Sequence, residues 1–281
     1  MKSNVDSPLE SDFMSKPSSY RLAIVDLDDT LLGHDKEVST ANCEALRRLR
    51  AAGLEIVIAS GRHHDNIVIL EKKTGCEGWI ISSAGAMVRH AVTGEILHEY
   101  TLPTELALDV YGLNRKAKDS LIGYHRTGVY IEEETEWTLL DQKLSGVPSH
   151  RGDLQALAKD GLQKLMWSTN PERIDALLPE LERHFHDKLY VVHTEKHMIE
   201  FLSIQANKAQ GARAVAEKLG IAREQVVAFG DGNNDVPLLK WAGMSVAMNH
   251  GRESARKAAK AITPAGPPDE AFARAVEIVL A

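Results

Sequence analysis

Short apolar runs alternate with amphipathic stretches along the first third of the chain. The apolar runs Leu22–Leu27, Leu54–Ser60 and Trp79–Gly85 each have the length of a buried strand. Between them, residues 41–52 place apolar side chains at helical spacing and end before a glycine, and residues 65–75 are also predicted to be helical. This strand–helix–strand order predicts a parallel sheet with right-handed crossover connections.

The pattern changes after residue 86. Residues 87–100 predict a hairpin with its turn at Thr93-Gly94, residues 103–118 predict a helix, and residues 122–134 predict a second pair of strands. Further strand and helix segments follow in mixed order. This middle block is typical of a separate α+β unit inserted into the first one.

The alternating order returns near Asn207. Residues 212–219 place apolar side chains at i, i+3, i+4 and i+7, and residues 225–232, QVVAFGDG, predict a strand that ends in a polar turn. We therefore expect an α/β protein with a core of residues 20–86 and 197–281, an inserted α+β domain of residues 87–196 and a flexible N-terminal tail of residues 1–19.

Three carboxylates fall within four positions at the end of the first apolar run, in the stretch RLAIVDLDDTLL. Side chains at i and i+2 of an extended chain point to the same side, so Asp26 and Asp28 are predicted to face one pocket while Leu27 faces the core. Like charges repel each other there, which favours a bound cation. The alternative is a solvated turn at the end of a strand, where Asp is common.

GDGNND, residues 230–235, is a second acidic turn directly after a strand. In open α/β sheets, ligands bind at the carboxyl ends of the strands. Two acidic turns at that edge would supply the oxygen ligands that Mg²⁺ prefers. The alternative is an Asn/Gly turn in which Asp235 caps a helix.

Two other polar segments lie where a helix begins. Ser60-Gly61 follows a strand, and its hydroxyl and free N–H groups suit a phosphate; a plain helix N-cap is the alternative. Lys208 stands at a helix start, where the helix dipole opposes a cation. That position indicates an anionic partner, unless the lysine is simply exposed to solvent.

Composition narrows the class of protein. The chain has 281 residues and a net charge of −7, so it has no general electrostatic attraction to nucleic acid or to anionic membranes. An anionic substrate would need local positive charge or a metal. Cys43 and Cys76 have no paired ligand spacing, and residues 1–19 lack the apolar segment of a signal peptide. These features predict a cytoplasmic protein in a reducing compartment.

Four motifs in order, DLDDT, ASGR, NKAQGA and GDGNND, resemble those of the haloacid dehalogenase-like superfamily, and within it the Cof-type phosphatases. The resemblance covers about residues 21–263. It implies a Rossmann-like parallel-sheet core, with an inserted α+β cap of type B between the second and third motifs.

The resemblance also implies roles for individual residues. Asp26 would be the nucleophile that forms an aspartyl-phosphate, and Asp28 the general acid and then the base. The Mg²⁺ ligands would come from Asp26, Asp28 through its backbone carbonyl, Asp231 and Asp235, the last through water or by orienting Lys208. The phosphate-binding groups would be Leu27, Thr30, Ser60, Gly61, Lys208 and Asn234, with Thr30 bracing the loop.

The chain departs from the family pattern at three places that leave this catalytic set intact. Ala84-Gly85-Ala86 replaces the usual Asn-Gly-Ala, Asn249-His250-Gly251 replaces Gly-Asn-Ala, and residues 264–268 replace an acidic run. The cap is expected to cover the site and to supply specificity. Candidate specificity residues are Arg62, His125, Arg126 and Tyr130.

Together these features predict a Mg²⁺-dependent phosphatase that acts on a small phosphorylated metabolite, a sugar phosphate or a similar phosphomonoester. The expected partner is that small molecule, with no nucleic acid and no membrane. One alternative is a phosphomutase of the same architecture, which would return the phosphoryl group to the sugar. The other is a catalytically silent binding or regulatory protein, against which the intact acidic motifs argue.

Overall fold

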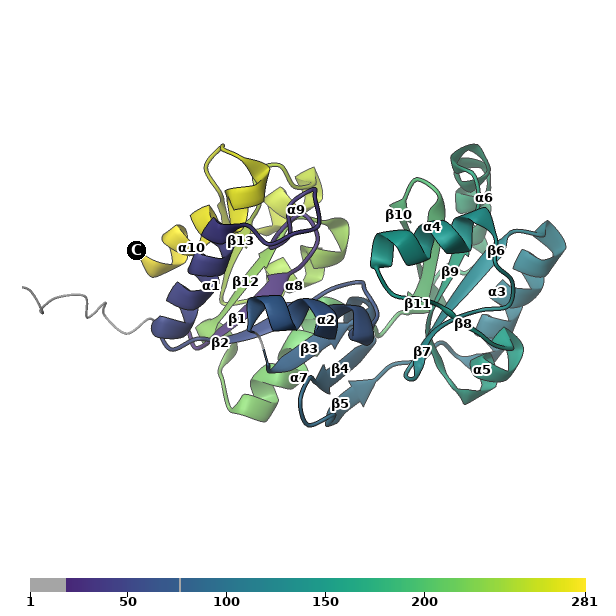
Figure 1. Ribbon diagram of the computed structural model, residues 1–281, viewed down its shortest axis with the longest axis horizontal. Helices are drawn as coiled ribbons and strands as arrows, with labels where there is room; N and C mark the ends of the chain where they lie inside the picture. The colour runs from purple at the N-terminus through teal and green to yellow at the C-terminus, as the bar shows by residue number, and fades with distance from the viewer. Residues whose placement is uncertain (1–18, 76) are drawn as a thin grey trace, which may run out of the picture.

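The computed structural model describes residues 19–75 and 77–281. The tail expected at residues 1–19 lies, except for Ser19, outside the described residues, as does Cys76. Two sheets, each with its own helices, form the two parts of the protein, called the core and the cap below (Figure 1). None of the helices in the two described ranges combines the length and apolar character that a membrane crossing requires.

The core is built on an eight-stranded sheet in the order β14-β13-β12-β1-β2-β3-β4-β5. Neighbours from β14 to β3 run parallel, and β4 and β5 continue the sheet antiparallel. The strands are β1 Leu22–Asp26, β2 Glu55–Ala59, β3 Trp79–Ser82, β4 Met87–His90, β5 Ile96–Glu99, β12 Val226–Gly230, β13 Met244–Ala247 and β14 Ala261–Ile262. The first strand of the chain, β1, thus lies between β2 and β12. In α/β proteins, ligands bind at the carboxyl ends of strands arranged in this way.

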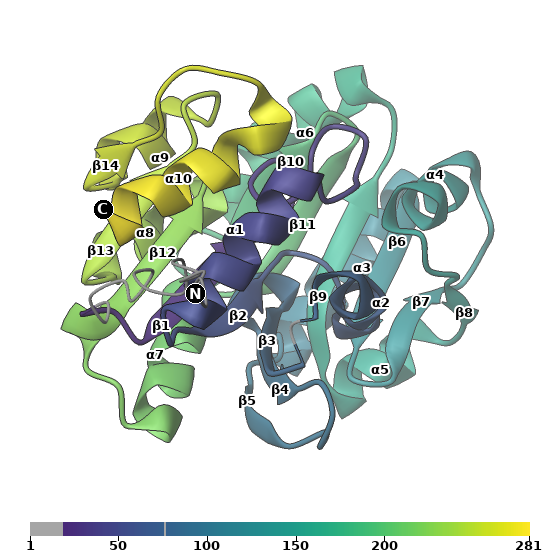
Figure 2. The same cartoon turned by 60° about the vertical axis from the view of Figure 1, so that its left-hand side comes forward.

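Helices cover both faces of the core sheet (Figure 2). Ala23 and Val25 of β1 pack toward α1 and α10, and Leu22 and Ile24 pack toward α7 and α8. Burial on both faces explains why β1 is an unbroken apolar run rather than an alternating one. The core helices are α1 Thr40–Ala51, α2 His64–Thr74, α7 Lys208–Leu219, α8 Val236–Trp241, α9 Glu253–Ala258 and α10 Ala271–Leu280.

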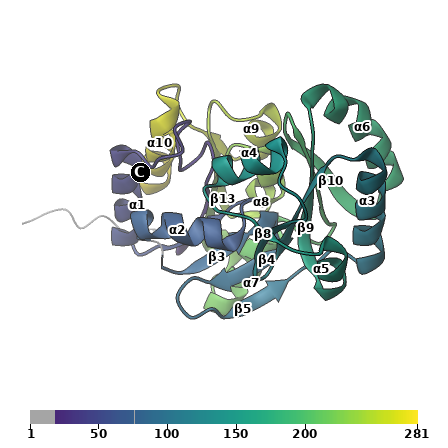
Figure 3. The ribbon, with the colours of Figure 1, turned by 45° about the vertical axis from the view of Figure 1, so that its right-hand side comes forward.

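The cap has a six-stranded sheet in the order β10-β11-β9-β6-β7-β8, antiparallel except for the parallel pair β7–β8. Helices α3, α5 and α6 lie on one face of this sheet (Figure 3). They pack there against side chains such as Trp167 and Phe201. The elements are β6 Ser120–His125, β7 Gly128–Ile131, β8 His150–Arg151, β9 Leu162–Ser168, β10 Leu189–Glu195, β11 Met198–Ser203, α3 Thr104–Ala117, α4 Glu136–Ser145, α5 Leu154–Asp160 and α6 Pro171–His184. The predicted α/β core with an inserted α+β cap is confirmed.

Sheet membership differs from the expected domain boundaries at both ends of the cap. The hairpin β4–β5, expected in the inserted domain of residues 87–196, extends the core sheet because β4 pairs along its length with β3. Strand β11, expected in the core segment 197–281, lies between β9 and β10 in the cap sheet. By its elements the cap therefore runs from Thr104 to Ser203.

Candidate active site

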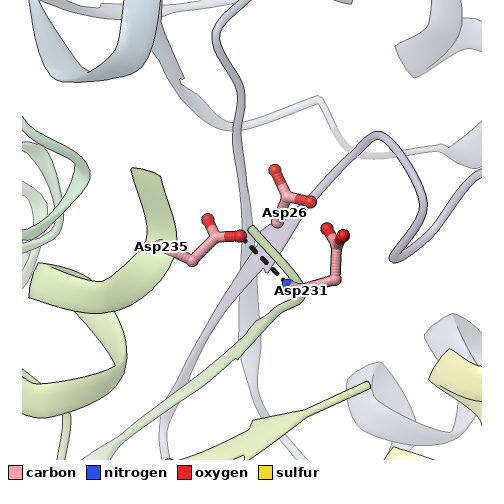
Figure 4. Close-up of side chains that lie close together, drawn as sticks. All are labelled: Asp26, Asp231 and Asp235. Atoms are coloured by element: carbon pink, nitrogen blue, oxygen red, sulfur yellow. Dashed lines mark hydrogen bonds between the residues drawn. The ribbon is translucent and has the colours of Figure 1, made fainter. Parts of the chain in front are cut away.

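Three carboxylates gather at the carboxyl ends of β1 and β12. These strands pair in parallel, with Val25 opposite Phe229, so the residues that follow them emerge next to each other. Asp26 ends β1, Asp231 follows β12, and Asp235 comes one helical turn later. Figure 4 shows the three side chains around one point, and each offers an oxygen within 4.8 Å of the others.

Lys208 is fully buried and brings positive charge to this cluster. Its Nζ donates to Oδ1 of Asp26 in a short contact and to Oδ1 of Asp235 at 2.6 Å. Asn207 caps α7 because its side-chain oxygen accepts the N–H of Gln210 at 3.0 Å. The lysine at the helix start thus meets carboxylates of the protein itself.

The start of α7 is pressed against Gly85. This glycine has a φ of +98°, and a Cβ there would lie 2.8 Å from the backbone N of Lys208 and closer still to the carbonyl group of Asn207. Both the backbone conformation and this contact require glycine. The loop after β3 therefore packs directly against the backbone that carries the lysine.

Asp235 is held on both of its oxygens. The lysine binds Oδ1, and Oδ2 accepts the N–H groups of Asp231 and Gly232 at 3.0 and 2.9 Å. Thr30 donates its hydroxyl to Oδ1 of Asp231 at 3.2 Å. Both carboxylate oxygens of Asp235 already accept hydrogen bonds from the protein. The carboxylates of Asp26 and Asp231 are therefore better placed to bind a ligand.

The cluster carries an excess of negative charge, since three carboxylates share one ammonium. Burial and the nearby Asp235 raise the pKa of Asp26 well above its ordinary value, although Lys208 opposes the shift. Burial and Asp235 likewise raise the pKa of Asp231 to about 6. A further cation would offset this penalty, and oxygen donors suit Mg²⁺. These residues therefore fit a divalent cation, which Asp26 and Asp231 would hold.

Asp28 is bound by two cations from other segments. Arg62 donates through Nε and Nη2 to the two carboxylate oxygens at 2.9 and 2.7 Å, and Lys36 donates to Oδ1 at 3.1 Å. Burial alone would raise the pKa of Asp28, but Arg62 and Lys36 together outweigh burial and lower it. In this conformation Asp28 is held ionised, the form that accepts a proton.

The other predicted phosphate-binding groups lie around the same strand ends. Ser60 follows β2, is buried, and accepts the N–H of Arg62 on its Oγ at 3.2 Å. The side chain of Leu27 packs in the core, as predicted from its position between two acids. Asn234 is half-buried beside Asp235. Their part in phosphate binding stays a prediction.

Comparison with known proteins agrees with this geometry. The sequence profile that describes the haloacid dehalogenase-like hydrolases matches residues 23–274. The chain belongs to the haloacid dehalogenase-like hydrolase family. The resemblance drawn from the four motifs is therefore confirmed, and enzymes of this family typically use Mg²⁺.

Individual relatives narrow the class of this hydrolase. Phosphatase YwpJ of Bacillus subtilis (strain 168) is 28% identical over 272 residues, covering 86% of this chain and 94% of that protein. The crystal structure of a haloacid dehalogenase-like hydrolase from Bacteroides thetaiotaomicron has a TM-score of 0.83 at 29% identity, covering 92% and 99% of the two chains. The subclass IIB sugar phosphatase BT4131 shares the fold, with a TM-score of 0.77 at 20% identity over 92% and 98%. The protein is a phosphatase of the haloacid dehalogenase-like family, a phosphoric monoester hydrolase.

Three candidate specificity residues of this hydrolase bind partners at the end of the β6–β7 hairpin. The ring of His125 and the hydroxyl of Tyr130 both contact Oγ1 of Thr127, at 2.7 and 2.9 Å. Arg126 pairs with Glu99 of the core at 3.4 Å. The structure brings the fourth candidate, the arginine at position 62, to Asp28. A role of the other three in specificity stays a prediction.

Sequence reasoning missed charged residues that the fold brings close to this site. Lys164 in β9 and Glu200 in β11 form a buried ion pair at 2.9 Å on the cap sheet. Each lies at a buried position of its strand, and a charge at a buried strand position is the signal that could have found them. Lys36, which binds Asp28, lies in an exposed polar turn that gives no such signal.

Asp141, on α4, gives the hydrolase a pH-dependent stability. It is 8% exposed, and burial raises its pKa to about 6, with Lys164 opposing the shift and Glu200 adding to it. Because the folded pKa exceeds the ordinary 3.8, the folded state binds this proton more tightly, and stability from the group is lost as pH rises through 6. We expect Asp141→Asn to raise the free energy of unfolding by up to about 3 kcal/mol near pH 8.

The gain should shrink toward zero as pH falls to about 4, and urea unfolding across this range measures it. Asp187→Asn is the matched control, since Asp187 is 88% exposed and loses the same charge. A gain that did not depend on pH would contradict the explanation.

Proposed function

We propose that this phosphatase hydrolyses a small phosphorylated metabolite, a sugar phosphate or a similar phosphomonoester, through an aspartyl-phosphate on Asp26. The observation that carries the proposal is the pairing of Asp26 with the fully buried Lys208, beside the carboxylate of Asp231. A carboxylate with a cation already placed next to it can approach a phosphate dianion at a low cost in charge repulsion.

The reaction would take two steps. First, an oxygen of Asp26 attacks phosphorus, the ester P–O bond breaks, and Asp28 gives a proton to the leaving oxygen. Water then attacks phosphorus and gives a proton to Asp28, which frees phosphate and restores the Asp26 carboxylate. Lys208 and the hydroxyl of Ser60 would bind phosphoryl oxygens. A divalent cation at Asp26 and Asp231 would neutralise charge on the phosphoryl group.

In this scheme the contact between Arg62 and Asp28 has to weaken, because Arg62 keeps Asp28 ionised. We expect substrate binding to weaken the Arg62–Asp28 contact, so that Asp28 can carry the proton that the first step needs. The cap would surround the leaving group, which favours small substrates over macromolecules.

Release of inorganic phosphate from a panel of monoesters with Mg²⁺ tests the proposal. We expect one group of small phosphate esters to reach a kcat/KM of about 10⁴ M⁻¹ s⁻¹ or more, with nucleic acids and phosphoproteins inert. Conversion of one sugar phosphate isomer into another, dependent on a sugar bisphosphate, would favour the phosphomutase. No turnover of any monoester would overturn the proposal.

A further inference from the structure

Lys164 is a buried lysine of the cap that reaches into the core. It lies in β9, is 2% exposed, and its Nζ stands 4.4 Å from the centroid of the Tyr124 ring. The same Nζ donates to Oε1 of Glu200 and to the backbone oxygen of Gly61, each at 2.9 Å. Lysine is rarely buried so fully without a specific partner. Here one partner belongs to the cap and the other to the loop that follows β2.

The oxygen that Lys164 binds belongs to the peptide group between Gly61 and Arg62. In a trans peptide the C=O and N–H point in opposite directions. The N–H of this same peptide, that of Arg62, donates to Oγ of Ser60 at 3.2 Å. The peptide is thus held at one end by the cap and at the other by the serine.

This arrangement decides what the serine hydroxyl can do. A hydroxyl has one donor hydrogen, and Oγ of Ser60 accepts from Arg62. Its hydrogen remains to be donated, and an anionic phosphoryl oxygen is a strong acceptor. The Arg62 side chain, on the other side of the same residue, binds Asp28 through two bonds. Arg62 therefore connects Ser60, a proposed phosphate-binding residue, to Asp28, the proposed general acid and base.

Other contacts seat the cap beside this peptide without touching it. Nε2 of His63 meets the backbone oxygen of His125 at 2.8 Å, and Nδ2 of Asn66 donates to the backbone oxygen of Ser145 at 3.4 Å. Among the described residues, Lys164 makes the hydrogen bond from the cap to the Gly61 carbonyl.

We propose that Lys164 is a positioning residue, which couples the docking of the cap to the orientation of the Gly61–Arg62 peptide and thereby of the Ser60 hydroxyl. The inference rests on the proposed function. With the cap docked, the ammonium fixes the peptide and directs the hydroxyl hydrogen to phosphate. With the cap away, the peptide can turn, and the loop binds phosphate less well.

The test needs variants in which no charged side chain stays buried without its ion-pair partner. Lys164→Met by itself would leave Glu200 buried and unpaired, so the main variant is the double substitution Lys164→Met with Glu200→Gln. Lys164→Arg is the conservative variant, which keeps a donor. The matched control is Lys218→Met with Glu95→Gln, a half-exposed ion pair of the core at 2.6 Å.

Three measurements report on the loop. The first is the dissociation constant of inorganic phosphate in the presence of Mg²⁺. The second is amide hydrogen exchange at Arg62. The third is kcat and KM with acetyl phosphate, whose leaving group is small, and with a hexose phosphate. Thermal unfolding shows whether each variant is folded.

We expect the main double variant to bind phosphate about tenfold more weakly, the effect of one charge-assisted hydrogen bond. Exchange at Arg62 should rise about tenfold, and kcat should fall alike for both substrates. In Lys164→Arg, phosphate affinity, amide exchange at Arg62 and kcat should lie between those of the double variant and the wild type. The control double variant should leave all three unchanged.

Unchanged phosphate binding and unchanged exchange at Arg62 would overturn the inference. A loss confined to the hexose phosphate would also overturn it, because Lys164 would then contact the leaving group. If the protein released no phosphate from any ester, the phosphate-binding and exchange measurements would still decide the role of Lys164, separately from the proposed function.

Discussion

Asp26→Asn is expected to lower phosphate release by at least about 10⁴-fold, the order of loss that follows removal of a nucleophile. An amide cannot form the acyl phosphate, and it no longer attracts Lys208 as an anion. Steady-state release of inorganic phosphate measures the loss. Mass spectrometry of acid-quenched protein should find phosphate on the peptide with residue 26 in the wild type alone.

The fold of this variant should remain intact. Burial and the other carboxylates already disfavour the ionised Asp26 in the metal-free protein, so an amide of the same shape is tolerated there. Thermal unfolding without metal should show a midpoint equal to or above that of the wild type. Near-wild-type turnover in a folded Asp26→Asn protein would end the assignment of the nucleophile.

Removal of divalent metal is the second change with a large expected effect. We expect EDTA to lower phosphate release by at least about 10³-fold and added Mg²⁺ to restore it, because three carboxylates would otherwise face the substrate with one lysine. Independently of turnover, Mg²⁺ at 100 times its dissociation constant should stabilise the fold by about 2.7 kcal/mol. This stabilisation should fade as pH falls through 6, since protons then compete for Asp231.

Asp231→Asn should lose most of the stabilisation by Mg²⁺, and the exposed Asp187→Asn should keep it. A metal at this site would be excluded if turnover were unchanged in EDTA and the midpoint of thermal unfolding did not depend on Mg²⁺.

The strand-end cluster was predictable because of a geometric rule. Parallel strands bring their carboxyl ends to one edge, so acids after two such strands meet once the strands are neighbours. The pairing of β1 with β12 does this for Asp26 and Asp231, which are far apart in the chain. The helix start at Lys208 was also visible, because Asn207 is a good N-cap.

Domain boundaries were harder to predict from the sequence, because the pattern of a strand does not show which sheet the strand joins. The hairpin of residues 87–99 has the turn signal that was expected at Thr93-Gly94, yet its pairing with β3 places it in the core. Helix α4 was also missed, in a polar region where Thr135 and Thr138 form its capping box. The sheet that the hairpin joins depends on contacts with distant parts of the chain, whereas the capping box of α4 is local and was overlooked.

Contacts between segments that are distant in the chain were the least predictable. Arg62 was proposed for specificity, and the structure places it on Asp28, where it sets the charge of that acid. Lys164 gave only the weak signal of a charge within a strand segment. Its partner Gly61 is about a hundred residues away, and no local pattern records that distance.

The close fit of Gly85 against Asn207 bears on how the cap can move. The chain returns from the cap to the core through residues 204–207, and the next residue is Lys208. A swinging cap would pull on this return segment. Because Gly85 has no side chain, the backbone of Asn207 packs directly against the loop after β3, and we expect this contact to oppose an inward shift of the segment before Lys208. We therefore expect the ammonium of Lys208 to stay beside Asp26 when the cap opens for a new substrate.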